Sequence, residues 1–156
     1  MPKKIYYSRK VVNATRIRFF DVALADAPGR EHDTNMISPS EFPADFTIRR
    51  IKVAFGCDLS VAELTRMITD SIIAFRAGDR AFEYYPVLLC LVDNIGGLVG
   101  AAGTAEGRII GSAVDSGLTI EPYLIPKGVK FEFFIQTLTT PAFGKVTVML
   151  EGDIAV

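Results

Sequence analysis

The amino-acid sequence predicts an all-β fold, an eight-stranded antiparallel β-sandwich with one short helix. Short segments alternate between apolar and polar residues, and clusters of turn-forming residues separate them. A single segment has the period of an amphipathic helix, and few strand pairs are separated by helices, which disfavours a parallel βαβ architecture. The 156 residues are 49% hydrophobic, enough for one domain with its own core.

The N-terminus is basic. Residues 1–20 hold six Lys or Arg side chains and no acidic one. We therefore divide the chain into a basic arm, residues 1–13, and a sandwich domain, residues 14–156. The arm is expected to be disordered in the free chain and to dock on a neighbour through its apolar residues; the alternative is a solubilising tail that leads into a strand. The candidate contact residues in the arm are Lys3, Lys4, Tyr6, Tyr7, Arg9 and Lys10.

The first predicted strand and a long loop follow the arm. Residues 15–20 place Ile17 and Phe19 on one face and arginines on the other. Residues 21–42 are rich in turn-forming residues and have no sustained period, so they predict a surface loop.

The second predicted strand, residues 46–55, changes phase along its length. Phe46 and Ile48 share one parity, whereas the apolar residues from Ile51 onward share the other. A β-bulge at Arg49-Arg50 would return both sets to the core face. The alternative is that Phe46 and Ile48 face a different neighbour.

The middle of the chain combines the helix with a β-hairpin. Residues 60–71 have apolar positions at spacings of three and four, and Ser60 with Glu63 fits a capping box. Residues 72–86 then flank Gly78-Asp79, a tight-turn signal, so they predict a hairpin.

Residues 94–112 are rich in glycine. They contain neither of the phosphate-loop patterns GxGxxG and GxxxxGK[ST], so phosphate binding is disfavoured there. We interpret the segment as a loop for inter-subunit contact, because small residues let a neighbouring chain approach closely. Leu98 and Val99 would insert into that neighbour as an apolar knob; the alternative is a loop that is merely tolerated.

Four further strands complete the sandwich. The last two are expected to form a hairpin through a loop at residues 139–144. Two four-stranded sheets, arranged as a jelly roll or another Greek key, accommodate this order of strands. The four strands are residues 87–92, 118–125, 130–136 and 145–151.

Composition weighs against catalysis and metal binding. The net charge is −1, and Cys57 and Cys90 have no CxxC spacing, so they are expected to be buried thiols. His32, the one histidine, falls in a polar loop segment and offers little to a metal site or a nucleophile-base pair. We therefore expect no enzymatic activity and no cofactor. No segment is long and apolar enough for a membrane-spanning helix or a signal peptide.

The layout resembles the single jelly-roll capsid proteins of icosahedral viruses, particularly bacteriophage coat proteins. A basic arm precedes the first strand, a long loop precedes the second, and a helix precedes the hairpin at Gly78-Asp79. The segments that carry the resemblance beyond these are Asn35-Met36-Ile37-Ser38-Pro39, Tyr123-Leu124-Ile125-Pro126-Lys127-Gly128 and Phe131-Glu132-Phe133.

The resemblance implies a virion protein that self-assembles into an icosahedral shell after synthesis in the host cytoplasm. Its partners would be copies of itself and other capsid proteins, with the basic arm contacting nucleic acid or acidic neighbour surfaces. A receptor- or carbohydrate-binding sandwich module is the alternative. The strands carried over in order would be residues 15–20, 46–55, 72–77, 80–86, 87–92 or 107–114, 118–125, 130–137 and 144–151.

Overall fold

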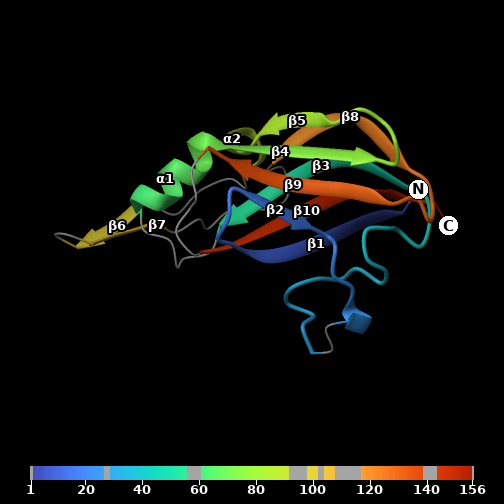
Figure 1. Cartoon of the computed structure of the whole chain (residues 1–156), viewed down its shortest axis with the longest axis horizontal. Helices are drawn as coiled ribbons and strands as arrows, with labels where there is room; N and C mark the ends of the chain where they lie inside the picture. Colours follow the sequence, from blue (N-terminus) through green and yellow to red (C-terminus); the bar gives the residue numbers. More distant parts are fainter. Residues whose placement is uncertain are drawn as a thin grey trace.

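The computed structural model consists of two four-stranded antiparallel sheets that pack face to face (Figure 1). It describes residues 2–26, 29–55, 61–91, 98–101, 104–107, 117–138 and 144–155. Sheet A has the order β1 (Lys3–Val12), β10 (Gly144–Ile154), β3 (Phe46–Phe55) and β8 (Leu118–Ile125). Sheet B has the order β2 (Arg16–Phe19), β9 (Phe131–Thr137), β4 (Ser71–Ala77) and β5 (Glu83–Pro86).

The connectivity of the eight strands is that of a single jelly roll. The first half of the chain pairs with the second half from the outside inward: β1 with β10, β2 with β9, β3 with β8, and β4 with β5. The chain is thus a long hairpin wrapped into two sheets, as in a double Greek key. The predicted all-β sandwich is confirmed.

Short elements lie outside the two sheets. The 3-10 helix η1 (Leu24–Asp26) is in the loop after β2, α1 (Val61–Asp70) joins β3 to β4, and α2 (Val87–Cys90) follows β5. Strands β6 (Leu98–Ala101) and β7 (Thr104–Gly107) pair as a separate hairpin. Figure 1 shows α1 and this hairpin at one end of the sandwich and both chain termini at the other. None of the described helices is both long and apolar enough to cross a membrane.

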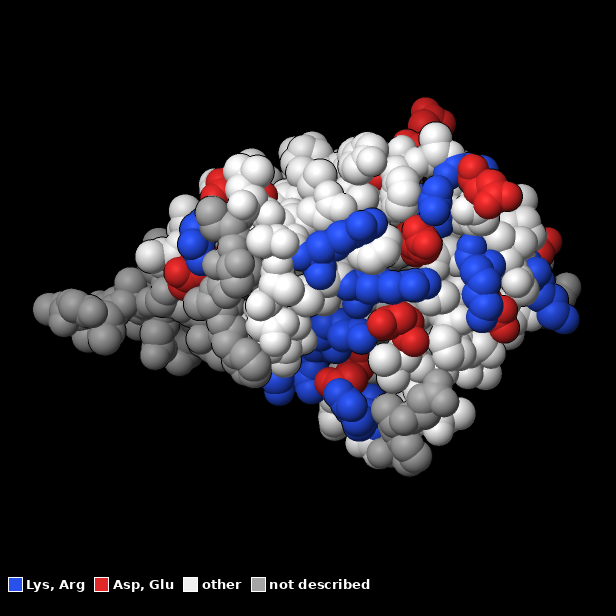
Figure 2. All heavy atoms as spheres, viewed as in Figure 1, with Lys and Arg blue, Asp and Glu red and all other residues white. Residues whose placement is uncertain are grey.

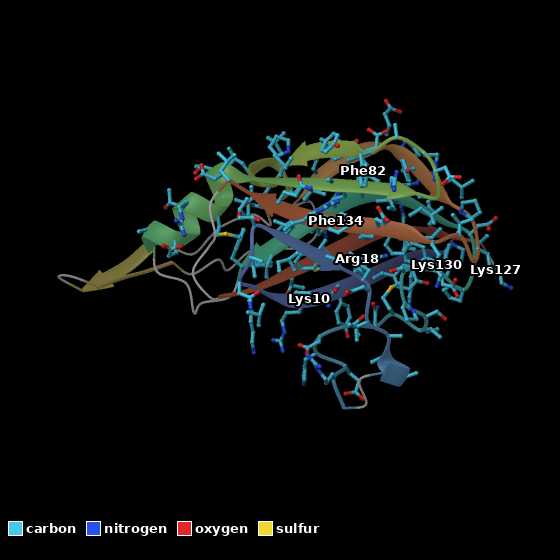
Figure 3. The ribbon with its side chains drawn as sticks, viewed as in Figure 1. Lys10, Arg18, Phe82, Lys127, Lys130 and Phe134 are labelled. Carbon is cyan, nitrogen blue, oxygen red and sulfur yellow. The ribbon has the colours of Figure 1, made fainter. Side chains whose placement is uncertain are left out.

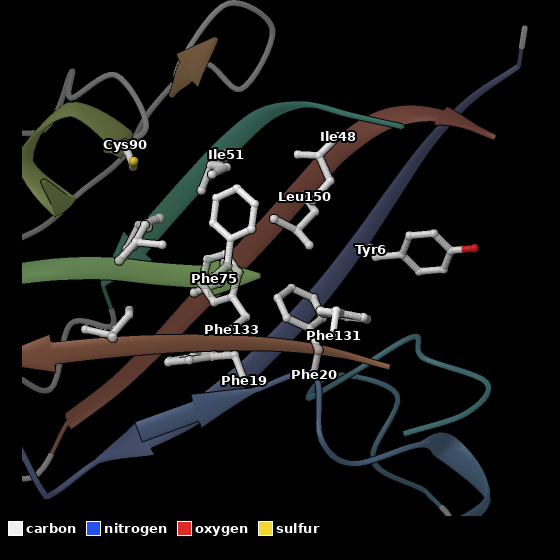
Figure 4. Packing of buried hydrophobic residues seen from close by; sticks show 14 of the residues in the cluster. Tyr6, Phe19, Phe20, Ile48, Ile51, Phe75, Cys90, Phe131, Phe133 and Leu150 are labelled. Carbon is white, nitrogen blue, oxygen red and sulfur yellow. The ribbon is translucent and has the colours of Figure 1, made fainter. Parts of the chain in front are cut away.

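The core between the sheets is rich in aromatic rings (Figure 4). Phe75 and Phe133 of sheet B stack with their centroids 5.8 Å apart. Phe42, from the loop before β3, stacks on Phe131 at 4.6 Å and tilts against Tyr6 at the same distance. Offset-stacked and edge-to-face rings contribute stability beyond the area that they bury. These rings join both sheets and the loop into one core.

The predicted β-bulge in β3 is present. Ile48 pairs with Gly152 and Arg50 pairs with Glu151, so Arg49 is an extra residue on the β3 side. The apolar residues on both sides of the bulge, including Ile48 and Ile51, are buried. The extra residue therefore restores the core-facing parity, which is the usual role of a bulge in a half-buried strand.

The basic N-terminal segment forms strand β1 of sheet A where disorder was expected, and the division into residues 1–13 and 14–156 stays a prediction. Strand β1 pairs with β10 without a gap, from Lys3 opposite Asp153 to Val12 opposite Gly144. Tyr6, Ser8 and Val12 of this strand are buried. The segment has no acidic partner nearby in sequence, but distant segments supply the acidic partners.

Two further predictions are corrected by the way the sheets assemble. Residues 87–90 form helix α2 instead of a buried strand, because Val87 and Cys90 point inward three residues apart while Leu88 and Leu89 are exposed. Strands β9 and β10 belong to different sheets, so they do not form the predicted hairpin, and residues 139–143 between them lie outside the described residues.

The other predicted elements agree with the structure where it describes them. Helix α1 and the hairpin of β4 and β5 are present, and Gly78 has a φ of +56° in the turn. Strands β6 and β7 lie inside the glycine-rich segment. Ser60, Cys57, residues 92–97 and most of the alternative strand at 107–114 lie outside the described residues.

Candidate functional site

The predicted contact residues near the start of β1 have partners within the chain. The Nζ of Lys3 lies 3.3 Å from Oδ1 of Asp153, and Oδ2 of the same carboxylate accepts a hydrogen bond from Nε of Arg49. The Nζ of Lys4 lies 5.4 Å from the centroid of the Tyr6 ring. Tyr6 itself is only 2% exposed, and burial raises the pKa of its phenol. Tyr6 is therefore a core residue of the single chain, and its role in subunit contact stays a prediction.

Tyr7 and the loop before β3 close the outer edge of β1. The side chain of Asn35 accepts a hydrogen bond from the Tyr7 amide at 2.9 Å and donates one to the Ile5 carbonyl at 2.8 Å. The Tyr7 hydroxyl donates to the carbonyl of Glu31. Ser8 and Thr34 form an antiparallel bridge nearby. The loop thus satisfies backbone groups that an edge strand would otherwise present to another chain.

The other half of β1 contributes to a cluster of charged residues around Asp33. Oδ1 of Asp33 accepts from Nε of Arg9 at 2.9 Å, and Oδ2 accepts from Nε of Arg30 at 2.9 Å. Burial alone would raise the pKa of Asp33, but the hydrogen bonds and charges of Arg30 and Arg9 outweigh it and hold the pKa below its usual value. Asp33 is therefore ionised and holds two guanidinium groups side by side.

These residues border a surface groove that we call the basic groove. It has a volume of about 350 Å³. The groove is lined by Arg9, Lys10, Val11, Arg30, Asp33 and Lys145. Lys145 lies opposite Val11 on the neighbouring strand, and Nζ of Lys10 is 2.6 Å from Oδ1 of Asp21. Among the described residues, four cationic side chains and one carboxylate thus line the groove, and two of the cations, Arg9 and Arg30, share that carboxylate.

The outer face of sheet B has a second cluster, of arginines and aromatic rings. The guanidinium of Arg16 lies 3.8 Å from the centroid of Phe134, and that of Arg76 lies 4.4 Å from the centroid of Phe82. The rings of Phe82 and Phe134 are 6.5 Å apart. Figure 3 shows Lys10, Arg18, Phe134 and Phe82 following one another across this view of the molecule. Basic side chains also cross this face in Figure 2.

Next to this cluster lies a set of exposed apolar side chains, which we call the α2 strip. It consists of Ile72, Tyr84, Leu88 and Leu89. Tyr84 is 60% exposed, and Leu88 and Leu89 are 55% and 54% exposed. Ile72 pairs with Pro86, the residue directly before α2, so the start of this helix lies beside β4. In Figure 2 the corresponding upper edge of the molecule is largely uncharged.

Leu98 and Val99, the remaining predicted contact residues, lie in β6. Their partners in the ladder are Gly107 and Glu106 of β7. Their side chains lie outside the described part of the structure. The prediction that they contact a neighbouring subunit therefore stays a prediction.

The other side chains that could react or bind a metal are dispersed over the described part of the chain. Burial raises the pKa of the Cys90 thiol to about 12, which is typical of an unreactive structural cysteine. His32 is exposed in the loop, as predicted. Within the described residues no three His, Cys, Asp or Glu side chains come together in a group that could hold a metal ion.

Sequence reasoning missed Arg30, Asp33 and Lys145 in the basic groove, and Phe82 and Phe134 on sheet B. The groove residues come from three distant segments, and no local pattern connects them. The outward orientation of Phe134 could have been predicted from the sequence. Phe131, Phe133 and Ile135 alternate on the inward face of the strand, so Phe134 between them must face outward. An outward aromatic residue on a strand marks a candidate contact surface. Comparison of the chain with protein-family models, with curated proteins and with solved structures finds no match.

Proposed function

We propose that this chain is a structural subunit of a viral capsid, which assembles with copies of itself and with other capsid proteins into a closed shell. The jelly-roll connectivity supports the proposal, because viral capsid domains are among the proteins that use this architecture. The architecture also occurs in lectin domains, so the proposal rests on the surface as well as on the fold.

The α2 strip is the observation that carries the proposal. Single exposed apolar residues are ordinary on a protein surface, whereas contiguous apolar surface marks a contact site. The strip lies beside β5, an edge strand of sheet B, so a neighbouring subunit would cover apolar side chains and a sheet edge together. The β6–β7 hairpin, at the end of the molecule beyond α1, would supply a second contact through Leu98 and Val99 (Figure 1).

The test is particle formation by the purified chain, followed by light scattering and negative-stain microscopy. The wild-type chain is expected to give closed shells or lattice sheets. Leu88→Asp with Leu89→Asp should abolish or strongly reduce them, because two charges would be buried at the contact. Since both side chains are exposed, the free energy of unfolding of the monomer should change by less than about 0.5 kcal/mol.

Thr65→Asp with Thr119→Asp is the matched control, because it adds the same charge at two exposed polar positions. Normal particles from the control and none from the Leu88 and Leu89 variant would support the proposal. Equal assembly of both variants would refute the contact at the α2 strip. A wild-type chain that forms only a discrete small oligomer and adheres to sugars would favour the carbohydrate-binding alternative.

A further inference from the structure

The basic groove gathers cationic side chains from segments that are distant in the sequence. Arg9 and Lys10 come from β1, Lys145 from β10 and Arg30 from the loop before β3. Among the described residues that line the groove, Asp33 is the acidic one. Nζ of Lys10 is 2.6 Å from Oδ1 of Asp21, whereas Arg9 and Arg30 share the single carboxylate of Asp33, so the two guanidinium groups keep a joint positive charge that favours an anion.

Asp33 orients the two arginines and leaves them donors for a ligand. It accepts from Nε of Arg30 at 2.9 Å and from Nε of Arg9 at 2.9 Å. Its Oδ1 is also 2.8 Å from one terminal nitrogen of Arg9. A guanidinium has five N–H donors in a fixed plane, so each arginine keeps further donors beyond those that Asp33 engages. Fixing the arginines in advance reduces the entropy that a ligand must overcome on binding.

The chemistry of the groove fits a phosphate group. Guanidinium groups bind phosphate oxygens through paired hydrogen bonds, and the ammonium groups of lysines add point charges. The two oxygens of a carboxylate ligand would pair with the guanidinium group of one arginine. A phosphate has enough oxygens to accept hydrogen bonds from both arginines and a lysine. At about 350 Å³ the groove lies near the lower end of the range of ligand sites, with room for a phosphate and an attached group.

We propose that the basic groove binds a phosphate group, either as free phosphate or within the phosphodiester backbone of a single-stranded nucleic acid. The second source has a structural continuation. From Lys10 the basic side chains lead across Figure 2 towards sheet B, where Arg16 stacks on Phe134. A cationic groove followed by aromatic and arginine platforms is the arrangement with which proteins hold single strands. This proposal is independent of shell assembly.

The experiment is calorimetric titration of the unassembled full chain with inorganic phosphate, with acetate and with a short oligothymidylate. Arg30→Gln with Lys145→Gln removes two cations from the groove. Lys4→Gln with Lys127→Gln is the matched control, because it removes the same charge from exposed positions outside the groove. Thermal unfolding verifies that each variant is folded, and Lys145→Gln alone replaces the double groove variant if that variant is not.

The groove variant should bind phosphate, the oligonucleotide or both about tenfold more weakly than the wild type, as expected for lost charge-assisted hydrogen bonds. The control should bind within about twofold of the wild type, a change smaller than that from one lost charge-assisted bond. Binding of phosphate alone identifies the free ion as the ligand, and binding of the oligonucleotide alone identifies the phosphodiester. Equal affinities of the groove variant and the control, acetate binding as tight as phosphate binding, or no binding of either phosphate source would overturn the proposal.

Discussion

Gly152 should be the glycine least tolerant of substitution among those that the structure describes in β10. It sits opposite Ile48, next to the bulge at Arg49, where β3 and β10 approach closely. A Cβ on Gly152 would overlap the carbonyl oxygen of Thr47 and would lie 2.8 Å from its carbonyl carbon. Both atoms belong to the backbone, so no side-chain rotation relieves the overlap, and Gly152→Ala must push β3 away from β10.

The size of the effect follows from the two consequences of that displacement. Overpacking a well-packed site costs about 1–3 kcal/mol. Leaving a buried ladder hydrogen bond unmade costs about 1–3 kcal/mol more. We therefore expect Gly152→Ala to lower the free energy of unfolding by about 2–6 kcal/mol, and the thermal midpoint by roughly 10 °C for a domain of this size.

Urea unfolding followed by far-UV circular dichroism measures this change. Gly128→Ala is the control, because Gly128 has a φ of +74° and a Cβ there would meet nothing within 4 Å. It should cost only the backbone strain of a left-handed alanine, about 1–2 kcal/mol. If Gly152→Ala is no more destabilising than Gly128→Ala, the close approach of the two strands at the bulge is wrong.

Two further predictions concern β1. Deleting residues 1–13 should leave no folded monomer, because it exposes the edge of β10 and removes Tyr6 and Val12 from the core; a cooperative thermal transition of the truncated chain would contradict this. Hydrogen bonding from Arg49 holds the pKa of Asp153 below its usual value, against the effect of burial, and Lys3 adds to it. The ion pairs of Asp153 should therefore stabilise the fold above about pH 4 and lose their effect as the pH falls through the lowered pKa. Between pH 7 and pH 2 the thermal midpoint of Asp153→Asn should fall less than that of the wild type; equal falls would show that Asp153 contributes nothing.

The amino-acid sequence by itself determined the elements whose signals are local. Alternation of apolar residues predicted β2, β9 and β10, because each strand has one face towards the core. The change of phase at Arg49 predicted the bulge, and the Gly78-Asp79 pair predicted the turn between β4 and β5. A chain with these signals and one amphipathic helix has few architectures open to it, so the sandwich was predictable.

Only the tertiary structure decided what the charges near the N-terminus do. The pattern of residues 1–13 shows cations without acidic neighbours, which is compatible with a disordered arm. In the folded chain Lys3 meets Asp153 from the opposite end of the sequence, and Arg9 meets Asp33 from the loop. Periodicity reports which way a side chain points along its own strand and carries no information about the segment that will lie beside it.

The same limit explains the remaining corrections and the basic groove. Whether β9 and β10 share a sheet depends on the pairing of each with distant strands, and Val87 to Cys90 becomes a helical turn because the core admits only its first and last residues. The basic groove exists because β1, β10 and the loop before β3 converge there. Its charge is a property of that convergence, since the electrostatic field of a site sums over neighbours in space, whereas a sequence pattern records neighbours along the chain.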